Sequence, residues 1–220
     1  ARFGKTLQWK SMRHRFIFIG AKYKISTHIM GFSPNIDFYN KMNEVFPLVG
    51  KKIFLQHGIS KDDLPQLYEE KTKLDMFVCG AKPEYDFIRS KFHYKNGEVK
   101  YTGLARYDAL SNYSTENQIL IMPTWRMYFN NQTNEEIEQS VYVKVWNDIL
   151  SNERLIEKLK ERNLTLFFYP HYEMQKHISL FKSSSDHVVI ADFASYDVQD
   201  LLKKSKLLIT DYSSVFFDFA

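Results

Sequence analysis

The sequence predicts an α/β protein built on parallel β-sheets, and three observations support this prediction. Short runs rich in β-branched and aromatic residues alternate along the chain with helical patterns. Many of these runs are apolar throughout, as in parallel strands that are covered on both faces. Two segments, Lys10–His28 and Gln199–Ser214, each have the pattern of a helix, a strand and a polar turn, which suits two similar α/β domains.

Several short β-rich runs are predicted as strands. In chain order they are Tyr23–Thr27, Lys52–Gln56, Met76–Cys79, Val99–Thr102, Ile119–Met122, Leu164–Tyr169, His187–Ile190 and Leu207–Thr210. Helical patterns lie between them. They are Lys61–Lys73, Pro83–Phe92, Glu135–Arg162 and Asp197–Lys204.

The helices are predicted from their apolar stripes and from the residues at their ends. Pro83 stands where a first helical turn accepts proline. The longest pattern carries an apolar stripe and is predicted to break near Ser151 and Asn152. The last residues, Phe217–Ala220, resemble the start of a further helix, so we expect the second domain to continue beyond them.

The composition is that of a globular protein. Of the 220 residues, 44% are hydrophobic and 25% are charged, which excludes a disordered tail or a low-complexity array. The single cysteine, Cys79, excludes a disulfide framework and indicates a reducing compartment. The longest apolar stretch near the N-terminus is far shorter than the roughly 20 residues that span a bilayer, so neither a transmembrane helix nor a signal peptide is expected.

Charge is distributed unevenly between the two halves of the chain. Residues 1–110 contain 19 Lys and Arg against 11 Asp and Glu, whereas residues 111–220 contain 11 against 15. A basic half indicates an anionic partner (nucleic acid, an acidic membrane surface or a phosphate-rich substrate) or simply a solvated basic face. The sign changes near Ala109–Asn117, a polar cluster between two predicted strands. We therefore expect an N-terminal domain over 1–112 and a C-terminal domain over 113–220.

Polar side chains with catalytic potential follow the predicted strands, and ligands of open parallel sheets collect at those strand ends. His57 follows Lys52–Gln56, and we expect Gly58 to turn the chain sharply there. A histidine at this place can act as a general base near neutral pH. It can equally be a turn residue that is hydrogen-bonded to the backbone.

Three further strand ends carry candidates. The planar guanidinium of Arg126, which follows Ile119–Met122, suits a phosphate, although it could also stack on Trp125 at the surface. His171 follows Leu164–Tyr169, where a histidine can also be purely structural. After the last strand stands the most distinctive group, the segment 210–214.

That segment, Thr-Asp-Tyr-Ser-Ser, precedes an apolar helical start. Hydroxyls and free N–H groups at the beginning of a helix bind phosphate, so Ser213 and Ser214 are candidate phosphate ligands. The alternative is simple N-capping by Asp211 or Ser213, and the two roles are compatible. We expect both serines to begin a helix.

Several common catalytic motifs are absent from the sequence. It contains no P-loop, no GxGxxG after a strand, no CxxC pair, no HExxH and no GxSxG elbow. The sequence therefore predicts chemistry without a metal ion.

Five short blocks, taken in order, resemble the CDP-glycerol glycerophosphotransferase family. They are Gln-His-Gly at 56–58, Gly-Leu-Ala-Arg-Tyr-Asp at 103–108, Pro-Thr-Trp-Arg at 123–126, Tyr-Pro-His at 169–171 and Thr-Asp-Tyr-Ser-Ser-Val-Phe-Phe-Asp-Phe-Ala at 210–220. These enzymes are teichoic acid polymerases and primases, with relatives that build capsular polyol phosphates. The resemblance implies a GT-B fold, in which two Rossmann-like domains face a cleft, with both domains incomplete in this chain.

The resemblance also implies the substrates and the cellular place. The donor would be CDP-glycerol or CDP-ribitol, with no cofactor besides it and no metal. The acceptor would be a lipid-linked polyol phosphate, reached from the cytoplasmic face of the cell membrane by a peripheral enzyme. The basic first domain would face the anionic membrane and the polymer, and nucleic acid would not be a partner.

Roles follow from the same resemblance, residue by residue. His57 matches the proposed catalytic base, and His171 matches a second essential histidine that contacts the donor pyrophosphate; the two are expected to approach each other across the cleft. Tyr172 replaces the proline that usually follows the second histidine. The remaining residues expected to bind substrate are Gly58, Thr124, Arg126, Asp211, Ser213 and Ser214.

Two other classes of function stay open on the sequence. A GT-B glycosyltransferase that uses a UDP-sugar would share the fold and would prefer UDP over CDP. A non-catalytic nucleic-acid-binding module would explain the basic half and would bind with a steep salt dependence. The sequence also leaves open glycerol against ribitol, primase against polymerase, and teichoic acid against capsule.

Overall fold

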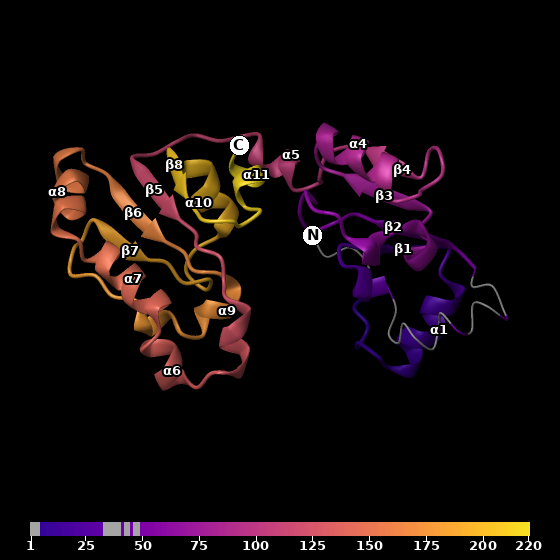
Figure 1. The fold of residues 1–220 in the computed structure, drawn as a ribbon, viewed down its shortest axis with the longest axis horizontal. Helices are drawn as coiled ribbons and strands as arrows, with labels where there is room; N and C mark the ends of the chain where they lie inside the picture. The colour runs from indigo at the N-terminus through magenta and orange to yellow at the C-terminus, as the bar shows by residue number, and fades with distance from the viewer. Residues whose placement is uncertain (1–4, 33–40, 42–44, 46–48) are drawn as a thin grey trace. The chain divides into compact units, whose positions relative to one another are not determined.

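The computed structural model describes residues 5–32, 41, 45 and 49–220. It divides the chain into two compact units, Ala1–Ala105 and Arg106–Ala220 (Figure 1). The sequence placed the boundary after position 112. The difference arises because α5 (Tyr107–Leu110) packs against α10 (Val198–Lys204), and because Arg106 donates two hydrogen bonds to Asp218 at 2.7 and 2.9 Å.

The first unit contains a parallel sheet with the strand order β1-β2-β3-β4. Its described elements in chain order are α1 (Met12–Gly20), β1 (Tyr23–Ser26), the 3-10 turn η1 (Ile29–Phe32), β2 (Lys51–Phe54), the 3-10 turn η2 (Pro65–Leu67), α3 (Glu69–Thr72), β3 (Met76–Cys79), α4 (Lys82–Lys91) and β4 (Val99–Tyr101). All four strands were predicted.

One face of this sheet is the core of the first unit. Phe54, Phe77 and Val99 pack there with Ile88 and Phe92 from α4 and its end. Figure 1 shows α4 alongside β3 and β4, which it contacts. We expected strands covered on both faces. The edge strand β1 departs from this expectation, because Tyr23 and Ile25 are exposed.

α1 is attached to the sheet through few side chains. Ser11 caps it by accepting a hydrogen bond from the His14 N–H, and Phe18 is its one buried residue. The ammonium of Lys24 on β1 lies 5.2 Å from the centre of the Phe18 ring and donates to the Ala21 carbonyl at 3.0 Å. Burial lowers the pKa of Lys24 below its ordinary value, helped by the nearby charge of Lys52.

The second unit contains a parallel sheet with the strand order β7-β6-β5-β8. Its further elements are β5 (Gln118–Ile121), η3 (Met127–Asn131), α6 (Asn134–Glu138), α7 (Val141–Leu150), α8 (Glu153–Glu161), β6 (Thr165–Phe168), α9 (Tyr172–Gln175), η4 (Ile178–Leu180), β7 (Val188–Ile190), β8 (Leu207–Ile209) and α11 (Phe216–Phe219). These strands were also predicted.

Helices cover both faces of this second sheet. Ile121 and Phe168 point into a core formed with α7 and α8. The neighbouring residues Leu120 and Phe167 point to the opposite face, where they meet Leu201 on α10 and its surroundings. Figure 1 shows this arrangement, with α7 and α8 beside β6 and β7 and with α10 beside β5 and β8. The strands of this sheet are therefore apolar throughout because both of their faces are covered, as predicted.

The helices differ from the prediction at two places. Glu135–Arg162 breaks at Ser151 and Asn152 as expected, but it also breaks before α7, because Ser140 accepts a hydrogen bond from the Val143 N–H and starts a new helix. Lys61–Lys73 is only η2 and α3, because Pro65 interrupts the pattern. Within the described residues, no helix has the length and apolar character required to cross a membrane.

Candidate active site

The order of strands in the second unit creates a switch point between β5 and β8. From β5 the chain moves outward to β6 and β7, then returns to place β8 on the other side of β5. Ile121 is in register with Ile209 at the ends of these two strands. In open parallel sheets, ligands bind outside the carboxyl ends of the strands at such a point.

Three predicted site residues meet at this switch point. Asp211, after β8, accepts hydrogen bonds from the Thr124 N–H at 3.0 Å and from the Thr124 hydroxyl. The Arg126 guanidinium donates from Nη2 to the other Asp211 carboxylate oxygen at 2.8 Å and from Nη1 to the Thr124 carbonyl at 2.8 Å. These contacts link the loop after β5 to the loop after β8.

The charges of this cluster stabilise each other. Partial burial opposes ionisation of Asp211, but hydrogen bonds from Thr124 and Arg126 outweigh it and lower its pKa to about 2. Burial likewise opposes the charged form of Arg126, and the Asp211 carboxylate nevertheless raises the pKa of Arg126. A carboxylate with so low a pKa is a poor proton acceptor at neutral pH, so Asp211 is unsuited to act as a general base.

The sequence also allowed Arg126 to stack on Trp125 at the surface, but its guanidinium lies against two tyrosine rings instead. Its guanidinium carbon lies 4.8 Å from the ring centre of Tyr212 and 5.4 Å from that of Tyr142, which is buried on α7. The cation is held between two tyrosines and one carboxylate. Tyr142 and Tyr212 gave no signal in the sequence that distinguishes them from ordinary core and loop aromatic residues.

His171 lies after β6, the strand next to β5, and caps α9. Its Nδ1 accepts a hydrogen bond from the Glu173 N–H at 3.2 Å. In the neutral ring the proton is therefore on Nε2, which is left as a hydrogen-bond donor. The ring is exposed and stacks on Trp125, with the ring centres 6.1 Å apart and the planes at 18°. Trp125 thus connects His171 to the loop that carries Arg126.

Ser213 and Ser214 precede α11 and do not begin it. The helix starts at Phe216, with Val215 at its N-cap, and Ser213 accepts a 3.4 Å hydrogen bond from the Val215 N–H. Within the part of the chain that the structure describes, the N–H groups of Ser213 and Ser214 have no protein acceptor. Asp211 faces Thr124 and Arg126, so it does not cap α11.

His57 stands after β2 in the first unit, and its ring is exposed. Its Nδ1 lies 3.1 Å from the Thr27 carbonyl oxygen. Because a carbonyl only accepts, Nδ1 carries the proton and Nε2 has the free lone pair. The two alternatives for His57 are therefore compatible. Its ring is hydrogen-bonded to the backbone through Nδ1, and its Nε2 can still accept a proton.

A buried network fixes the turn that carries His57. The chain bends at His57 and Gly58, as expected, and the left-handed backbone of this turn belongs to Gln56, with φ at 60°. Its side chain is buried and donates to the Glu84 carboxylate at 3.0 Å. Glu84, also buried, accepts from the N–H groups of Ser60 and Gly80 as well. The sequence reasoning missed Glu84, because an acid in a first helical turn is ordinary.

The structure thus brings Thr124, Arg126 and Asp211 together and connects His171 to them through Trp125. His57 and Gly58 belong to the first unit, and the approach of His57 to His171 stays a prediction. Within the described ranges, no three His, Cys, Asp or Glu side chains gather where they could hold a metal ion.

Two parallel α/β units with polar side chains after their strands define a Rossmann-like protein that takes its ligands at the strand ends. Residues 4–220 match the sequence model of the CDP-glycerol:poly(glycerophosphate) glycerophosphotransferase family. The chain belongs to this family.

Curated relatives and solved structures agree with that membership. The chain is 34% identical to the minor teichoic acid biosynthesis protein GgaB of Bacillus subtilis (strain 168), over all of this chain and 25% of the relative. It is 29% identical to the teichoic acid glycerol-phosphate primase of the same strain, over 73% of this chain and 41% of the relative. The chain therefore spans a quarter to two fifths of the length of these relatives.

The fold is shared with the wall teichoic acid polymerase TagF. One structure of TagF, a histidine-to-asparagine variant with CDPG after a soak, matches 90% of this chain and 50% of its own with a TM-score of 0.55. The sequence identity is 17%, so this likeness concerns the fold.

Proposed function

We propose that the protein transfers glycerol phosphate from CDP-glycerol to a lipid-linked polyol phosphate and releases CMP. Membership of the glycerophosphotransferase family supports the reaction class. The observation that carries the proposal is the cluster of Thr124, Arg126 and Asp211 at the β5–β8 switch point, where a nucleotide donor is expected to bind.

Arg126 is the main phosphate ligand of the proposed donor site. A guanidinium has five N–H donors, and the described residues accept from two of them, one at Thr124 and one at Asp211. The remaining donors are available to the pyrophosphate. Asp211 is better placed to orient Thr124 and Arg126 than to touch a phosphate, because its own charge would repel the ligand.

His171, Ser213 and Ser214 complete the donor site. His171 offers Nε2–H because its Nδ1 already accepts the Glu173 N–H. The two serines offer hydroxyls and backbone N–H groups that have no acceptor among the described residues. Donors placed in advance around a phosphate stabilise the charge that develops during its transfer.

His57 is the proposed base. The acceptor hydroxyl oxygen attacks the phosphorus that carries glycerol, a new P–O bond forms, and the bond to the bridging oxygen breaks as CMP leaves. The hydroxyl proton passes to Nε2 of His57, whose lone pair is free because Nδ1–H is held by the Thr27 carbonyl. General base catalysis of this kind contributes about 10²–10⁴-fold.

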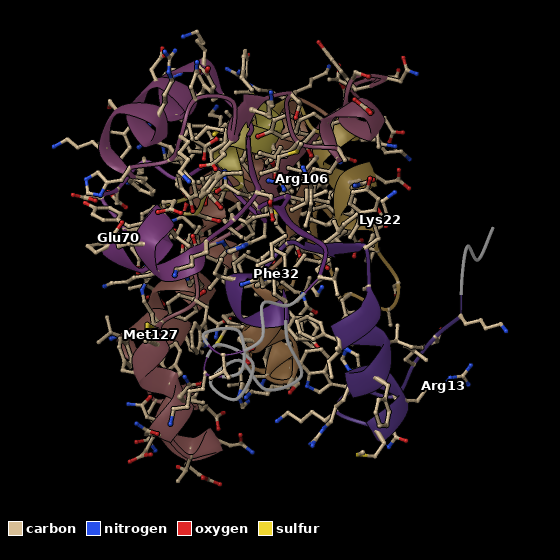
Figure 2. The ribbon with its side chains drawn as sticks, turned by 90° about the vertical axis from the view of Figure 1, so that its right-hand side faces the viewer. Arg13, Lys22, Phe32, Glu70, Arg106 and Met127 are labelled. Carbon is tan, nitrogen blue, oxygen red and sulfur yellow. The ribbon has the colours of Figure 1, made fainter. Side chains whose placement is uncertain are left out.

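The acceptor side of the proposal concerns α1 and the anionic membrane surface. Trp9, Met12 and Phe16 are exposed on or beside α1, and they alternate with Arg13 and Arg15. Figure 2 shows Arg13 extending outward from this helix. We propose that these side chains contact an anionic lipid surface, where apolar side chains can enter the headgroup region and basic ones are attracted by the lipid charge. Peripheral attachment at the cytoplasmic face follows from this proposal.

Nucleotide binding by calorimetry on the full-length protein tests the proposed donor. CDP-glycerol is expected to bind, and UDP-glucose is expected not to compete. Arg126→Ala should weaken CDP-glycerol binding at least about 10-fold. Arg154→Ala, on the exposed surface of α8, is the matched control and should leave it unchanged.

Two other outcomes would overturn the proposal, and a third would change only the polyol of the donor. Preference for UDP-glucose would make the protein a UDP-sugar glycosyltransferase. Salt-dependent binding of RNA or DNA, without nucleotide donor binding, would make it a nucleic-acid-binding module. Tighter binding of CDP-ribitol than of CDP-glycerol would keep the reaction class and change the polyol.

A further inference from the structure

A second histidine, His28, lies directly against His57. The two imidazole rings are stacked face to face, with their centres 4.4 Å apart and their planes at 2°. His28 comes after β1 and His57 after β2, and these strands are neighbours in the first sheet. His28 lies outside the five sequence blocks that resemble the family, and the proposed reaction assigns it no role.

Thr27 holds both rings. Its carbonyl accepts the hydrogen bond from Nδ1 of His57 at 3.1 Å. Its hydroxyl is hydrogen-bonded to Nδ1 of His28 at 3.0 Å. Each imidazole is therefore hydrogen-bonded to Thr27 through its Nδ1 atom.

The backbone of this segment is itself ordered by a local turn. The Ser26 hydroxyl donates to the His28 carbonyl at 2.7 Å and accepts from the His28 N–H at 3.1 Å. Phe32, four residues further on, is buried in the core of the first unit, at the end of η1. His28 therefore rests on a fixed turn, although its side chain is exposed.

We infer that His28 is a positioning residue for His57. The inference rests on the proposed function, in which His57 is the base. A ring stacked on one face of His57 opposes rotation of the imidazole about its bond to Cβ. The Thr27 carbonyl then receives Nδ1–H continuously, and the lone pair of Nε2 keeps one direction toward the acceptor hydroxyl.

The size of the effect follows from the strength of the contact. Stacked aromatic pairs contribute enough to change an equilibrium or a rate by about 2- to 10-fold. His28→Ala should therefore lower kcat by about 2- to 10-fold, with little change in KM. His28→Phe keeps a flat ring without a titratable nitrogen, and it should retain most of the wild-type kcat.

The inference is tested without activity by ¹⁵N NMR of histidine-labelled full-length protein at a pH where the rings are neutral. The wild-type His57 signals, assigned from the His57→Ala spectrum, should show a protonated Nδ1 and an unprotonated Nε2. His28→Phe should keep this tautomer, whereas His28→Ala should produce a mixture of both tautomers. His93→Ala, at an exposed histidine of the same unit bonded to Glu70, is the control and should leave the His57 signals unchanged.

Two results would overturn the inference. One is a His57 ring that carries its proton on Nε2 in the wild type. The other is a His28→Ala variant with the wild-type tautomer and the wild-type kcat. Failure of the proposed function would look different, because the wild type would then release no CMP while the NMR spectra could still show a held His57 ring.

Discussion

At the scale of single residues, the two histidines of the proposed site differ in which ring nitrogen is available. His57 donates from Nδ1 to a carbonyl, and its Nε2 is free to accept a proton. His171 accepts at Nδ1 from a backbone N–H, and its Nε2–H is free to donate. His57 is therefore left with a proton acceptor at Nε2 and His171 with a proton donor at Nε2, as the proposed roles require, and each state is set by a single main-chain group.

The ionisation of Asp211 provides a prediction at this scale. Hydrogen bonds from Thr124 and Arg126 lower its pKa to about 2, below the value near 3.9 of an unperturbed Asp. The folded protein is thus stabilised above about pH 4, and this stabilisation is lost as the pH falls toward 2, because the unfolded chain takes up the proton first. Replacing Arg126 with Gln should raise the pKa of Asp211 toward its ordinary value.

NMR titration of the Asp211 carboxyl carbon checks this prediction. The wild-type midpoint should lie near pH 2, and that of Arg126→Gln should be clearly higher. Equal midpoints in the two proteins would mean that the Arg126 contact does not stabilise the carboxylate.

At the scale of elements, the loops that follow the strands are fixed by buried polar contacts. The turn after β2 is the clearest case. Glu84, at the start of α4, accepts hydrogen bonds from the N–H of Ser60 in the loop after β2 and from the N–H of Gly80 after β3. Gln56 adds a third hydrogen bond to the same carboxylate. The position of His57 therefore depends on how α4 begins.

Glu84→Gln should destabilise the protein by about 1–3 kcal/mol. The new amide nitrogen cannot accept hydrogen bonds, so the partly buried N–H of Ser60 or of Gly80 loses its acceptor. Denaturant unfolding of the full-length protein measures the loss. Asp86→Asn, at an exposed position of the same helix, should stay within about 0.5 kcal/mol of wild type. Equal stability of Glu84→Gln and Asp86→Asn would contradict the role of the network.

The strands were predictable because a buried parallel strand is apolar throughout its sequence. For Met76–Cys79 the predicted and observed strands begin and end at the same residues. The start of α7 was not predictable, because Ser140 lies inside a continuous helical pattern and marks the break only by capping the new helix. The left-handed Gln56 was not either, since its cause is the contact with Glu84, 28 positions away. The partnership of Arg126 with Asp211 likewise depends on β5 and β8 being neighbours.

At the scale of the whole molecule, the two halves of the chain differ in charge, and the basic half includes α1. No acidic residue precedes Asp37, whereas seven basic residues do, among them Arg13 and Arg15. Basic residues near an anionic bilayer contribute about 1 kcal/mol each, and salt screens the attraction. The uneven charge therefore supports the proposed contact with an anionic bilayer.

Co-sedimentation with vesicles containing an anionic lipid checks this use of α1. The double variant Arg13→Glu, Arg15→Glu should bind about 10-fold more weakly or worse, and binding of the wild type should fall as salt rises. The same reversal at Arg154 and Lys160 on α8 should have little effect. Equal binding of both double variants would place the membrane contact elsewhere.

The central claim is that His57 and Arg126 act on the same transfer in different ways, and kinetics of the full-length protein test it most directly. The measurement is CMP release from CDP-glycerol with a lipid-linked acceptor, together with the affinity for CDP-glycerol. His57→Ala and His57→Asn should both abolish transfer and leave the affinity nearly unchanged, because a base contributes mainly in the transition state. Arg126→Ala should weaken both, because the phosphate charge exists before and during transfer. Substantial transfer by either His57 variant would contradict the account.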